Sequence, residues 1–368
     1  MNYTGGFLWI KKVADLIDNS NRYSVLKSYA YGDSKKAINR LFNKFYDVAR
    51  VIVHPPDIAV IDAWGEASII LWFILRIFQK KTKIFIVFHH HEARLPICKN
   101  LIESMYNFLI ECITSRMLKD SDIILTVSKS SMNELEHFYD IGRGKNKSKN
   151  LGINGTKGIL LKNINRNSGD IAIVGTGIDI DLLNVIILSK KKTDKKKDID
   201  FLCIGRIEKF IHLEKIWMKI KSVRPNSNMV IIGRTRAEMA DKLLSIGIDH
   251  RGFVSEEEKL DLYSRAKVFI FPSSREGFGI AVAEALFLGI SVIAWKIPVF
   301  EDLYSNNEEI KIKLVELGNV NLFAEECIKA IDRYNLNQSY RKYKSSSNVF
   351  LTWKTVAQNV ISVIEYTK

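Results

Sequence analysis

The feature that most constrains the fold is the alternation of short apolar runs with helical patterns along most of the 368 residues. This alternation is typical of βαβ units, in which helices join parallel strands. We expect strands at 23–26, 58–61, 83–88, 123–126 and 171–174 in the first half, and at 201–204, 229–232, 268–271 and 291–294 in the second. Because the chain exceeds the usual size of one domain, we predict an α/β protein with two doubly wound parallel-sheet domains facing across a cleft.

Helical patterns fill the gaps between these strands, as at 101–118 and 130–138. The most hydrophobic window, 67–78, is well short of the roughly 20 residues that a bilayer span needs, so we predict a buried helix there. A lysine-rich connector at 189–198 separates the two halves. We therefore place a first domain at 1–188 and a second domain at 199–349.

The formal charge of +14 predicts attraction to anionic partners such as nucleic acid, anionic lipid or phosphorylated small molecules. The basic runs lack interleaved aromatic residues, and no nucleic-acid reader motif is present, which weakens the first of these. Lys80, Lys81 and Lys83 adjoin the apolar window, and this patch favours peripheral contact with an anionic membrane surface.

The four cysteines show neither metal-site nor disulfide-framework spacing. We expect reduced, buried thiols in a cytoplasmic protein at Cys98, Cys112, Cys203 and Cys327. No apolar segment typical of a signal peptide follows Met1, so we predict none.

Basic residues follow the expected strands of the second half, at the strand ends where open α/β sheets bind ligands. They are Arg206 and Lys209, Arg234, and Arg275. The turn at 277–279 opens a helix whose free N–H groups and dipole favour an anion. Glu276 and Glu284 flank this turn, and buried acids are costly. We predict that the two glutamates accept hydrogen bonds from hydroxyls on either side of a diphosphate, as a nucleotide sugar would offer. The plainer alternatives are surface ion pairs for the cations and an exposed helix position for Glu284.

Three histidines, His89, His90 and His91, follow the expected strand at 83–88. Successive side chains diverge and no H-E-x-x-H pattern occurs, so we predict no metal site here.

The stretch EGFGIAVAE, residues 276–284, resembles the E-x7-E motif of the retaining glycosyltransferases of GT-B fold, family 4, also called glycosyl transferases group 1. Other pieces agree in order, namely 128–130, 176–179, the G-R element at 204–207, the G-x-V loop at 251–254, 255–271 and 350–353. The resemblance implies two Rossmann-like domains, with a C-terminal helix at 354–368 packing back on the first.

The resemblance implies an enzyme that transfers a sugar with retention from a nucleotide-diphosphate sugar to a glycan, lipid or glycoprotein acceptor. No metal ion and no cofactor beyond this donor are expected; the nearest Asp-x-Asp pattern, at 179–181, falls near the linker. The implied roles are sugar positioning for His89, approach to the transferred sugar for Glu276, diphosphate binding for Arg206, backbone donation around Phe278, Gly279 and Ile280, ribose binding for Glu284, and base recognition for Gly252 and Val254. Ile211 stands where the family has a lysine, so either Lys209 or Lys215 takes that place or the diphosphate is bound more weakly.

No strand precedes Gly5 and Gly6, where the family's glycine-rich loop follows a first strand, so we expect the first sheet to lack that strand. Two alternatives therefore stay open beside the enzyme. One is a catalytically silent GT-B scaffold, and the other is a basic nucleic-acid-binding protein.

Overall fold

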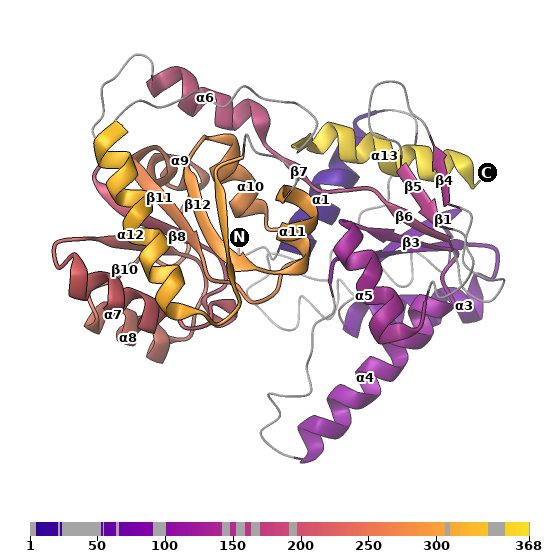
Figure 1. Cartoon of the computed structure of the whole chain (residues 1–368). Coiled ribbons are helices and arrows are strands. Elements are labelled where there is room, and N and C mark those ends of the chain that lie inside the picture. Colours follow the sequence, from indigo (N-terminus) through magenta and orange to yellow (C-terminus); the bar gives the residue numbers. More distant parts are fainter. Residues whose placement is uncertain are drawn as a thin grey trace. The chain divides into compact units, whose positions relative to one another are not determined.

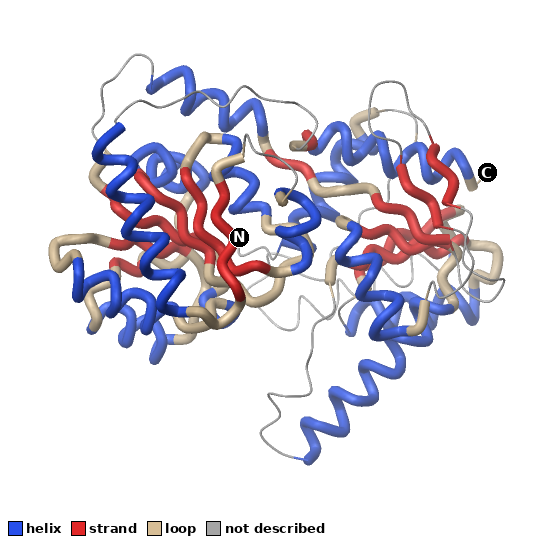
Figure 2. Tube along the Cα trace, viewed as in Figure 1, coloured by secondary structure: helices blue, strands red, loops and turns tan. Residues whose placement is uncertain are grey.

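The computed structural model describes residues 5–20, 23, 53, 55–63, 66–90, 101–141, 148–151, 159–162, 170–190, 197–305, 310–337 and 350–367. The chain divides into two units, one of Met1–Gly177 with Trp353–Lys368 and one of Ile178–Thr352 (Figure 1). Each unit contains a six-stranded sheet with helices against it, as Figure 2 shows in red and blue.

The sheet of the second unit has the strand order β10-β9-β8-β11-β12-β13. Its strands are β8 (Ile199–Ile204), β9 (Met229–Ile232), β10 (Asp249–His250), β11 (Ala266–Phe271), β12 (Ser291–Lys296) and β13 (Ile312–Glu316), and all neighbours are parallel. In sequence order this is 3-2-1-4-5-6, the doubly wound arrangement expected from the sequence. The order reverses between β8 and β11, which is where such sheets bind ligands.

Helices cover both faces of this sheet and complete the core. They are α6 (Ile180–Lys190), α7 (Leu213–Val223), α8 (Ala237–Ser245), α9 (Glu256–Arg265), α10 (Ile280–Phe287), α11 (Pro298–Tyr304) and α12 (Val320–Asn337). In α7 the buried residues Leu213, Ile216, Trp217 and Ile220 recur at helical spacing and form one apolar stripe. Burying each such side chain contributes roughly 1.5 to 3 kcal/mol.

The sheet of the first unit has the order β1-β2-β3-β6-β5-β4. Its strands are β1 (Ile58–Asp62), β2 (Lys83–Phe88), β3 (Ile123–Thr126), β6 (Asp170–Ile173), β5 (Ile159–Lys162) and β4 (Ser148–Leu151). The first four are parallel, and β5 and β4 add an antiparallel edge. Its helices are α1 (Gly5–Asp18), α3 (Glu66–Phe78), α4 (Leu101–Lys119), α5 (Lys129–Tyr139) and α13 (Trp353–Tyr366).

The division between the units falls earlier than the connector at 189–198. Helix α6 contacts α9 and so belongs to the second unit, whereas the expected first domain ran to residue 188. Helix α13 packs against α1, and the Asn359 side chain donates to the Val174 carbonyl at 2.9 Å. The short strands β7 (Gly177–Ile178) and β14 (Leu351–Thr352) lie where the chain passes between units.

Two expectations were wrong, and others fall outside the described residues. The helix at 67–78 is not buried, because one side of α3 is exposed. Cys112 is exposed, whereas Cys203 and Cys327 are buried as expected. Outside the described part lie His91, Cys98, residues 191–196 and, apart from Tyr23, the strand expected at 23–26.

Candidate functional site

The site lies where the order of the second sheet reverses, at the carboxyl ends of β8 and β11. After β8 the chain passes Arg206 into a short 3-10 turn, η2 (Ile207–Lys209). The loop after β11 is tied to this turn, because Ile211 N donates to Pro272 O at 3.0 Å and Ser274 N donates to Lys209 O at 3.1 Å. These backbone bonds hold the two loops side by side.

Glu276 lies in the second loop and faces the first. The Ser273 hydroxyl donates to Glu276 Oε1 at 2.9 Å, and Lys209 Nζ lies 3.7 Å from the same oxygen. Both charged side chains are largely shielded, with 18% of Glu276 and 20% of Lys209 exposed. Both residues were predicted from the sequence to belong to one site, and in the structure they lie close together.

Glycines let the ends of β8 and β9 approach each other closely. Gly233 has φ 134, and a Cβ there would come within 1.9 Å of the Gly205 carbonyl oxygen. Ile207 N donates to Arg234 O at 3.2 Å, and both Arg206 and Arg234 are exposed at this edge. The two arginines therefore lie on adjacent backbone segments at this edge.

Helix α10 begins at this edge without a side-chain cap. Its N-cap residue Gly279 has φ 83, and Phe278 and Gly279 are buried. A Cβ at Gly279 would lie 2.6 Å from Phe300 Cε1, so this position of the turn requires glycine. The first-turn N–H groups, beginning with Ile280, have no intrahelical acceptor, which suits them to bind an anion.

Glu284 is buried on α10, with 6% of the residue exposed, so the alternative of an exposed helix glutamate is wrong. Lys259 Nζ lies 3.1 Å from Oε1, and Tyr263 Oη lies 2.9 Å from Oε2. Tyr263 Oη also lies 3.0 Å from the Ala281 carbonyl oxygen, which anchors the phenol to the first turn of α10. A carboxylate can accept about four hydrogen bonds, so Glu284 keeps acceptor capacity for a ligand.

The partners of Glu284 have shifted pKa values with identifiable causes. Burial lowers the pKa of Lys259, but the carboxylates of Glu284 and Glu256 outweigh it, so the pKa is raised above its usual 10.5. Burial, followed by the negative charge of Glu284, raises the pKa of Tyr263 well above 10. Lysine therefore stays cationic and tyrosine stays a neutral donor around Glu284 at neutral pH.

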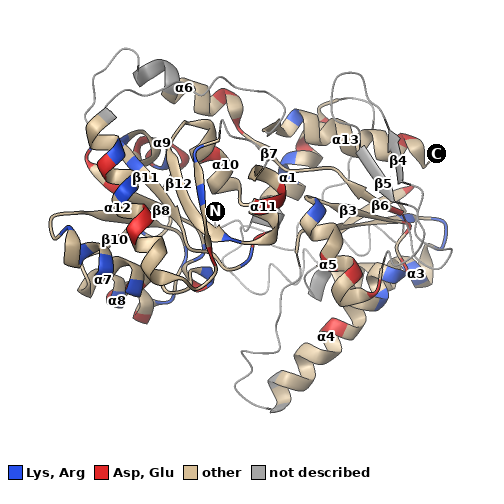
Figure 3. Ribbon diagram, in the orientation of Figure 1, with Lys and Arg blue, Asp and Glu red and all other residues tan. Residues whose placement is uncertain are grey.

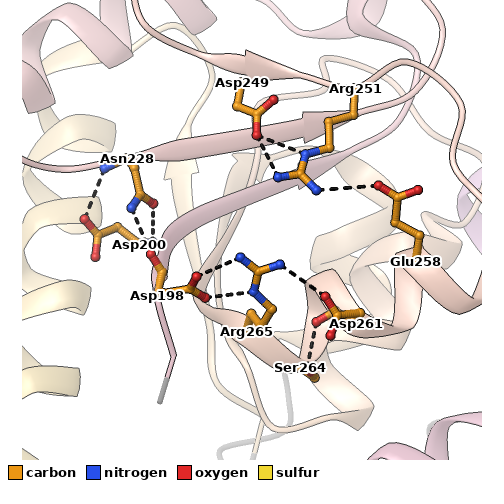
Figure 4. Close-up of polar contacts among 9 residues, drawn as sticks. All are labelled: Asp198, Asp200, Asn228, Asp249, Arg251, Glu258, Asp261, Ser264 and Arg265. Carbon is orange, nitrogen blue, oxygen red and sulfur yellow. Dashed lines mark hydrogen bonds and ion pairs between the residues drawn. The ribbon is translucent and has the colours of Figure 1, made fainter. Parts of the chain in front are cut away.

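The loop that carries Gly252 and Val254 is fixed to the same edge. Gly233 N donates to Gly252 O at 2.7 Å. Arg251 donates to Asp249 Oδ2 through Nε and Nη2, both at 2.9 Å, and its Nη1 lies 3.5 Å from Glu258 (Figure 4). Glu258 thus links the first turn of α9 to this loop, and the same helix carries Lys259 and Tyr263.

The remaining contacts in Figure 4 lie at the opposite, amino end of β8 and stabilise the fold. Arg265 binds both oxygens of Asp198 at 2.8 and 2.7 Å and reaches Asp261 at 3.2 Å. The hydrogen bond from Arg265 lowers the pKa of Asp198 below its usual 3.8. Asp200 exchanges hydrogen bonds with Asn228 at 2.9 and 3.1 Å.

His89 lies in the first unit, directly after β2, and is half-buried. Its ring meets the Trp9 ring edge to face, with centroids 5.9 Å apart, and Trp9 Nε1 donates to Gly175 O at 2.8 Å. The Ser131 hydroxyl donates to the His89 carbonyl, and Ser128 caps α5 by accepting from Ser131 N at 3.0 Å. Contacts from α1 and from the first turn of α5 therefore hold the His89 segment in place.

The second unit brings together the other predicted site residues. Sequence reasoning missed Lys259, Tyr263 and Ser273, which hold the two glutamates, because their contacts depend on the packing of separate elements. It also missed Trp9. Among the described residues, no group of three or more His, Cys, Asp or Glu side chains is placed to hold a metal ion.

The part of the chain that matches a known protein family lies in the second unit. A family model for glycosyl transferases group 1 matches residues 185–346. The O-antigen chain mannosyltransferase RfbU of Salmonella typhimurium is 30% identical over 181 residues, which cover 43% of this chain and 48% of RfbU. An uncharacterized glycosyltransferase of Haemophilus influenzae is 25% identical over 154 residues, covering 40% of this chain and 42% of the relative. The chain thus spans about half the length of these curated relatives.

Solved structures resemble the chain over nearly all its length. Sucrose-phosphate synthase from Thermosynechococcus elongatus has a TM-score of 0.69 at 13% identity, covering 99% of this chain and 94% of the synthase. A glycosyltransferase from Rickettsia africae has a TM-score of 0.62 at 15% identity, covering 99% and 95%. Anabaena HepE in complex with UDP-glucose has a TM-score of 0.61 at 12% identity, covering 90% and 84%. The expected GT-B fold, with two Rossmann-like domains, is confirmed.

Proposed function

We propose that this chain is a glycosyltransferase of group 1, whose family model matches residues 185–346, and that it transfers a sugar with retention from a nucleotide-diphosphate sugar to an acceptor. The observation that carries this proposal is the shared edge of β8, β11 and α10. There Lys209 lies 3.7 Å from Glu276, beside Arg206 and the uncapped start of α10.

Each part of the donor has a matching group at this edge. The diphosphate binds Arg206, Lys209 and the N–H groups at Gly279 and Ile280, and the ribose hydroxyls donate to Glu284. Glu276 contacts the transferred sugar, and the loop of Gly252 and Val254 binds the base. His89 of the first unit positions the sugar and stabilises it as the bond to the diphosphate breaks.

The leaving diphosphate gains negative charge during transfer, and fixed positive groups stabilise that charge without reorganising. Arg206, Lys209 and the dipole of α10 supply such groups, so the reaction requires no divalent metal ion. This part of the proposal rests on the cations that are present at the edge.

The relatives support a hexose donor and a glycan acceptor. RfbU is named an O-antigen chain mannosyltransferase, and HepE has been solved with UDP-glucose. We extend this to a lipid-linked glycan acceptor that the protein meets in the cytoplasm at a membrane surface.

A panel of nucleotide sugars tests the proposal. The full chain is incubated with each one, released nucleoside diphosphate is measured by mass spectrometry, and thermal unfolding is followed in parallel. We expect at least one nucleotide sugar to raise the unfolding temperature and to be slowly hydrolysed. Stabilisation by duplex DNA but by no nucleotide sugar would favour the nucleic-acid alternative. A silent scaffold would be favoured if a nucleotide sugar stabilises the chain but is neither hydrolysed nor used for transfer to any acceptor tested.

A further inference from the structure

Helix α3 carries an exposed apolar stripe. Ile70, Phe73 and Ile77 recur at helical spacing and expose 52%, 57% and 47% of their surface. The opposite side of the helix holds Leu75, which is fully buried against the sheet. The helix is therefore anchored on one side while it shows large apolar side chains on the other.

Helix α4 repeats this arrangement. Ile102, Met105 and Leu109 are each more than half exposed and lie on one side of the helix at spacings of three and four. Tyr106 and Phe108 widen the exposed apolar surface around the first turns. Helix α4 extends beyond its sheet in Figure 1, and most of its ribbon carries no charge in Figure 3.

The two helices lie on the same face of the first sheet. Helix α3 joins β1 to β2 and α4 joins β2 to β3, and these three strands are parallel neighbours. Right-handed crossovers in one direction place both helices on one face with the same polarity. Trp72 Nε1 donates to Asp120 Oδ2 at 3.1 Å, which ties α3 to the end of α4. We call their exposed residues the α3–α4 surface.

Basic residues follow the apolar stripe on both helices. Exposed Lys80 and Lys81 come directly after α3, and exposed Arg116 and Lys119 continue the stripe of α4. The neighbouring acids Asp120 and Asp122 are paired with Arg76. Lys83 does not belong to this group, because it is half-buried and donates to the Thr367 carbonyl.

This charge pattern distinguishes between possible occupants of the surface. In a symmetric contact between two copies, the same cations would approach one another, which is unfavourable. An anionic lipid surface offers both an apolar interior for the stripes and negative head groups for the lysines and arginines.

We propose that the α3–α4 surface binds peripherally to an anionic lipid bilayer, with its apolar stripes in the interface and its basic ends at the head groups. Helix α3 has 13 residues, and none of the helices in the described part of the chain is long and apolar enough to cross a membrane. None of the proposed donor-binding residues of the second unit belongs to this surface.

Vesicle flotation of the full chain tests this proposal. We expect recovery with vesicles of phosphatidylcholine and phosphatidylglycerol in low salt, little recovery with phosphatidylcholine alone, and loss in high salt. The double variants Phe73→Ser with Ile77→Ser, and Lys80→Glu with Lys81→Glu, should each weaken binding by about tenfold or more. The matched control is Val223→Ser with Leu244→Ser, two exposed apolar residues of the second unit, which should bind like the unchanged chain.

Three results would overturn the proposal: no recovery in low salt, equal recovery with neutral vesicles, or full binding by both α3-side variants. The surface would be assigned to a second copy instead if the chain does not float but forms a dimer in light scattering, and if Phe73→Ser with Ile77→Ser converts that dimer to monomers. Stabilisation by nucleotide sugars is measured on the same variants and should not change. Loss of flotation therefore stays distinguishable from failure of the donor site.

Discussion

At the scale of single residues, the surroundings of Glu284 decide how its role can be tested. Its carboxylate accepts from Lys259 and Tyr263, so alanine would remove a charged acceptor from both donors and leave them only Glu256 and the Ala281 carbonyl, at about 1 to 3 kcal/mol of stability. A loss of donor affinity in that variant would be mixed with a loss of folding. Glutamine keeps the shape and an oxygen but removes the charge.

We therefore predict that Glu284→Gln weakens nucleotide-sugar binding by about 1 kcal/mol or more while the chain stays folded, because hydrogen bonds to a charged acceptor are the stronger ones. Titration calorimetry measures the affinity. Glu326→Gln is a matched control, since Glu326 is also buried and lies 3.1 Å from Lys329 on α12. Equal affinities for both variants would remove Glu284 from the donor site.

The same surroundings predict how donor binding depends on pH. The raised pKa of Lys259 keeps it cationic, and the raised pKa of Tyr263 keeps it neutral, as pH rises toward about 9.5. Stability from Lys259 is present below its unfolded pKa near 10.5 and is lost as pH rises through its higher folded value. We expect donor affinity to be flat between about pH 7 and 9.5 in calorimetry. A titration with a midpoint below about pH 9 would contradict this.

Arg206 tests the phosphate part of the site. Arg206→Ala should lower donor hydrolysis by about a hundredfold or more, because it removes fixed positive charge from the leaving diphosphate. Hydrolysis by the unchanged chain should persist in excess EDTA. Arg333→Ala is the control, since that side chain is 65% exposed on α12. Activity that vanishes with EDTA and returns with magnesium or manganese would show that the phosphate site works differently.

At the scale of helices and strands, the carboxyl edge of the second sheet depends on close backbone contact. Gly233 packs against the Gly205 carbonyl, and Gly233 N donates to Gly252 O, so the ends of β8, β9 and the loop after β10 form one continuous edge. Any side chain at Gly233 would force the strand ends apart. The arginines that follow would move with them.

Gly233→Ala should therefore lower the free energy of unfolding by more than about 2 kcal/mol and weaken donor binding. Gly247→Ala is its control, because Gly247 also has positive φ but an added Cβ meets nothing within 4 Å. Backbone strain alone should cost that control about 1 kcal/mol. Urea unfolding compares the two, and equal losses would mean that the contact between the strand ends contributes nothing.

The predictability of these elements followed their burial. The central strands are covered on both faces and read as continuous apolar runs, so β2, β3, β8, β9, β11 and β12 were predicted closely. The edge strand β13 has alternating polar residues and β10 has two residues, and neither was predicted. Helix α3 was misread as buried because it is apolar on both sides, and a sequence cannot say which side meets the sheet.

At the scale of the whole molecule, the formal charge of +14 favours binding to duplex DNA as well as to the nucleotide-sugar donor, and these two interactions should differ in salt dependence. Weak contact with duplex DNA would arise from scattered phosphate contacts and should fall steeply with salt. We predict such weak contact in fluorescence anisotropy and its loss near physiological salt, while donor affinity from calorimetry changes little. Tight, salt-resistant DNA binding would contradict the glycosyltransferase proposal.

The two-unit organisation was also predictable, but the boundary was not. Alternating strands and helices gave two series of elements, and the lysine-rich connector suggested a division at 189–198. Helix α6 precedes that connector yet packs on α9, a contact between segments about 70 residues apart that no local pattern records. The same reason explains why Glu276 and Glu284 could be proposed from their spacing, while their neighbours Lys259 and Tyr263 could not.

The path of the chain also sets the order in which the units can be completed during synthesis. The second unit is one uninterrupted segment, 178–352, so all six of its strands exist before α13 is made. The first unit starts earlier but needs α13, which packs on α1 and donates from Asn359 to Val174. At about 5 to 20 residues per second, the ribosome needs roughly 9 to 35 seconds to make residues 178–352, and the first unit stays open for that time. A chaperone that binds the nascent chain would therefore meet the unit that was begun first and finished last.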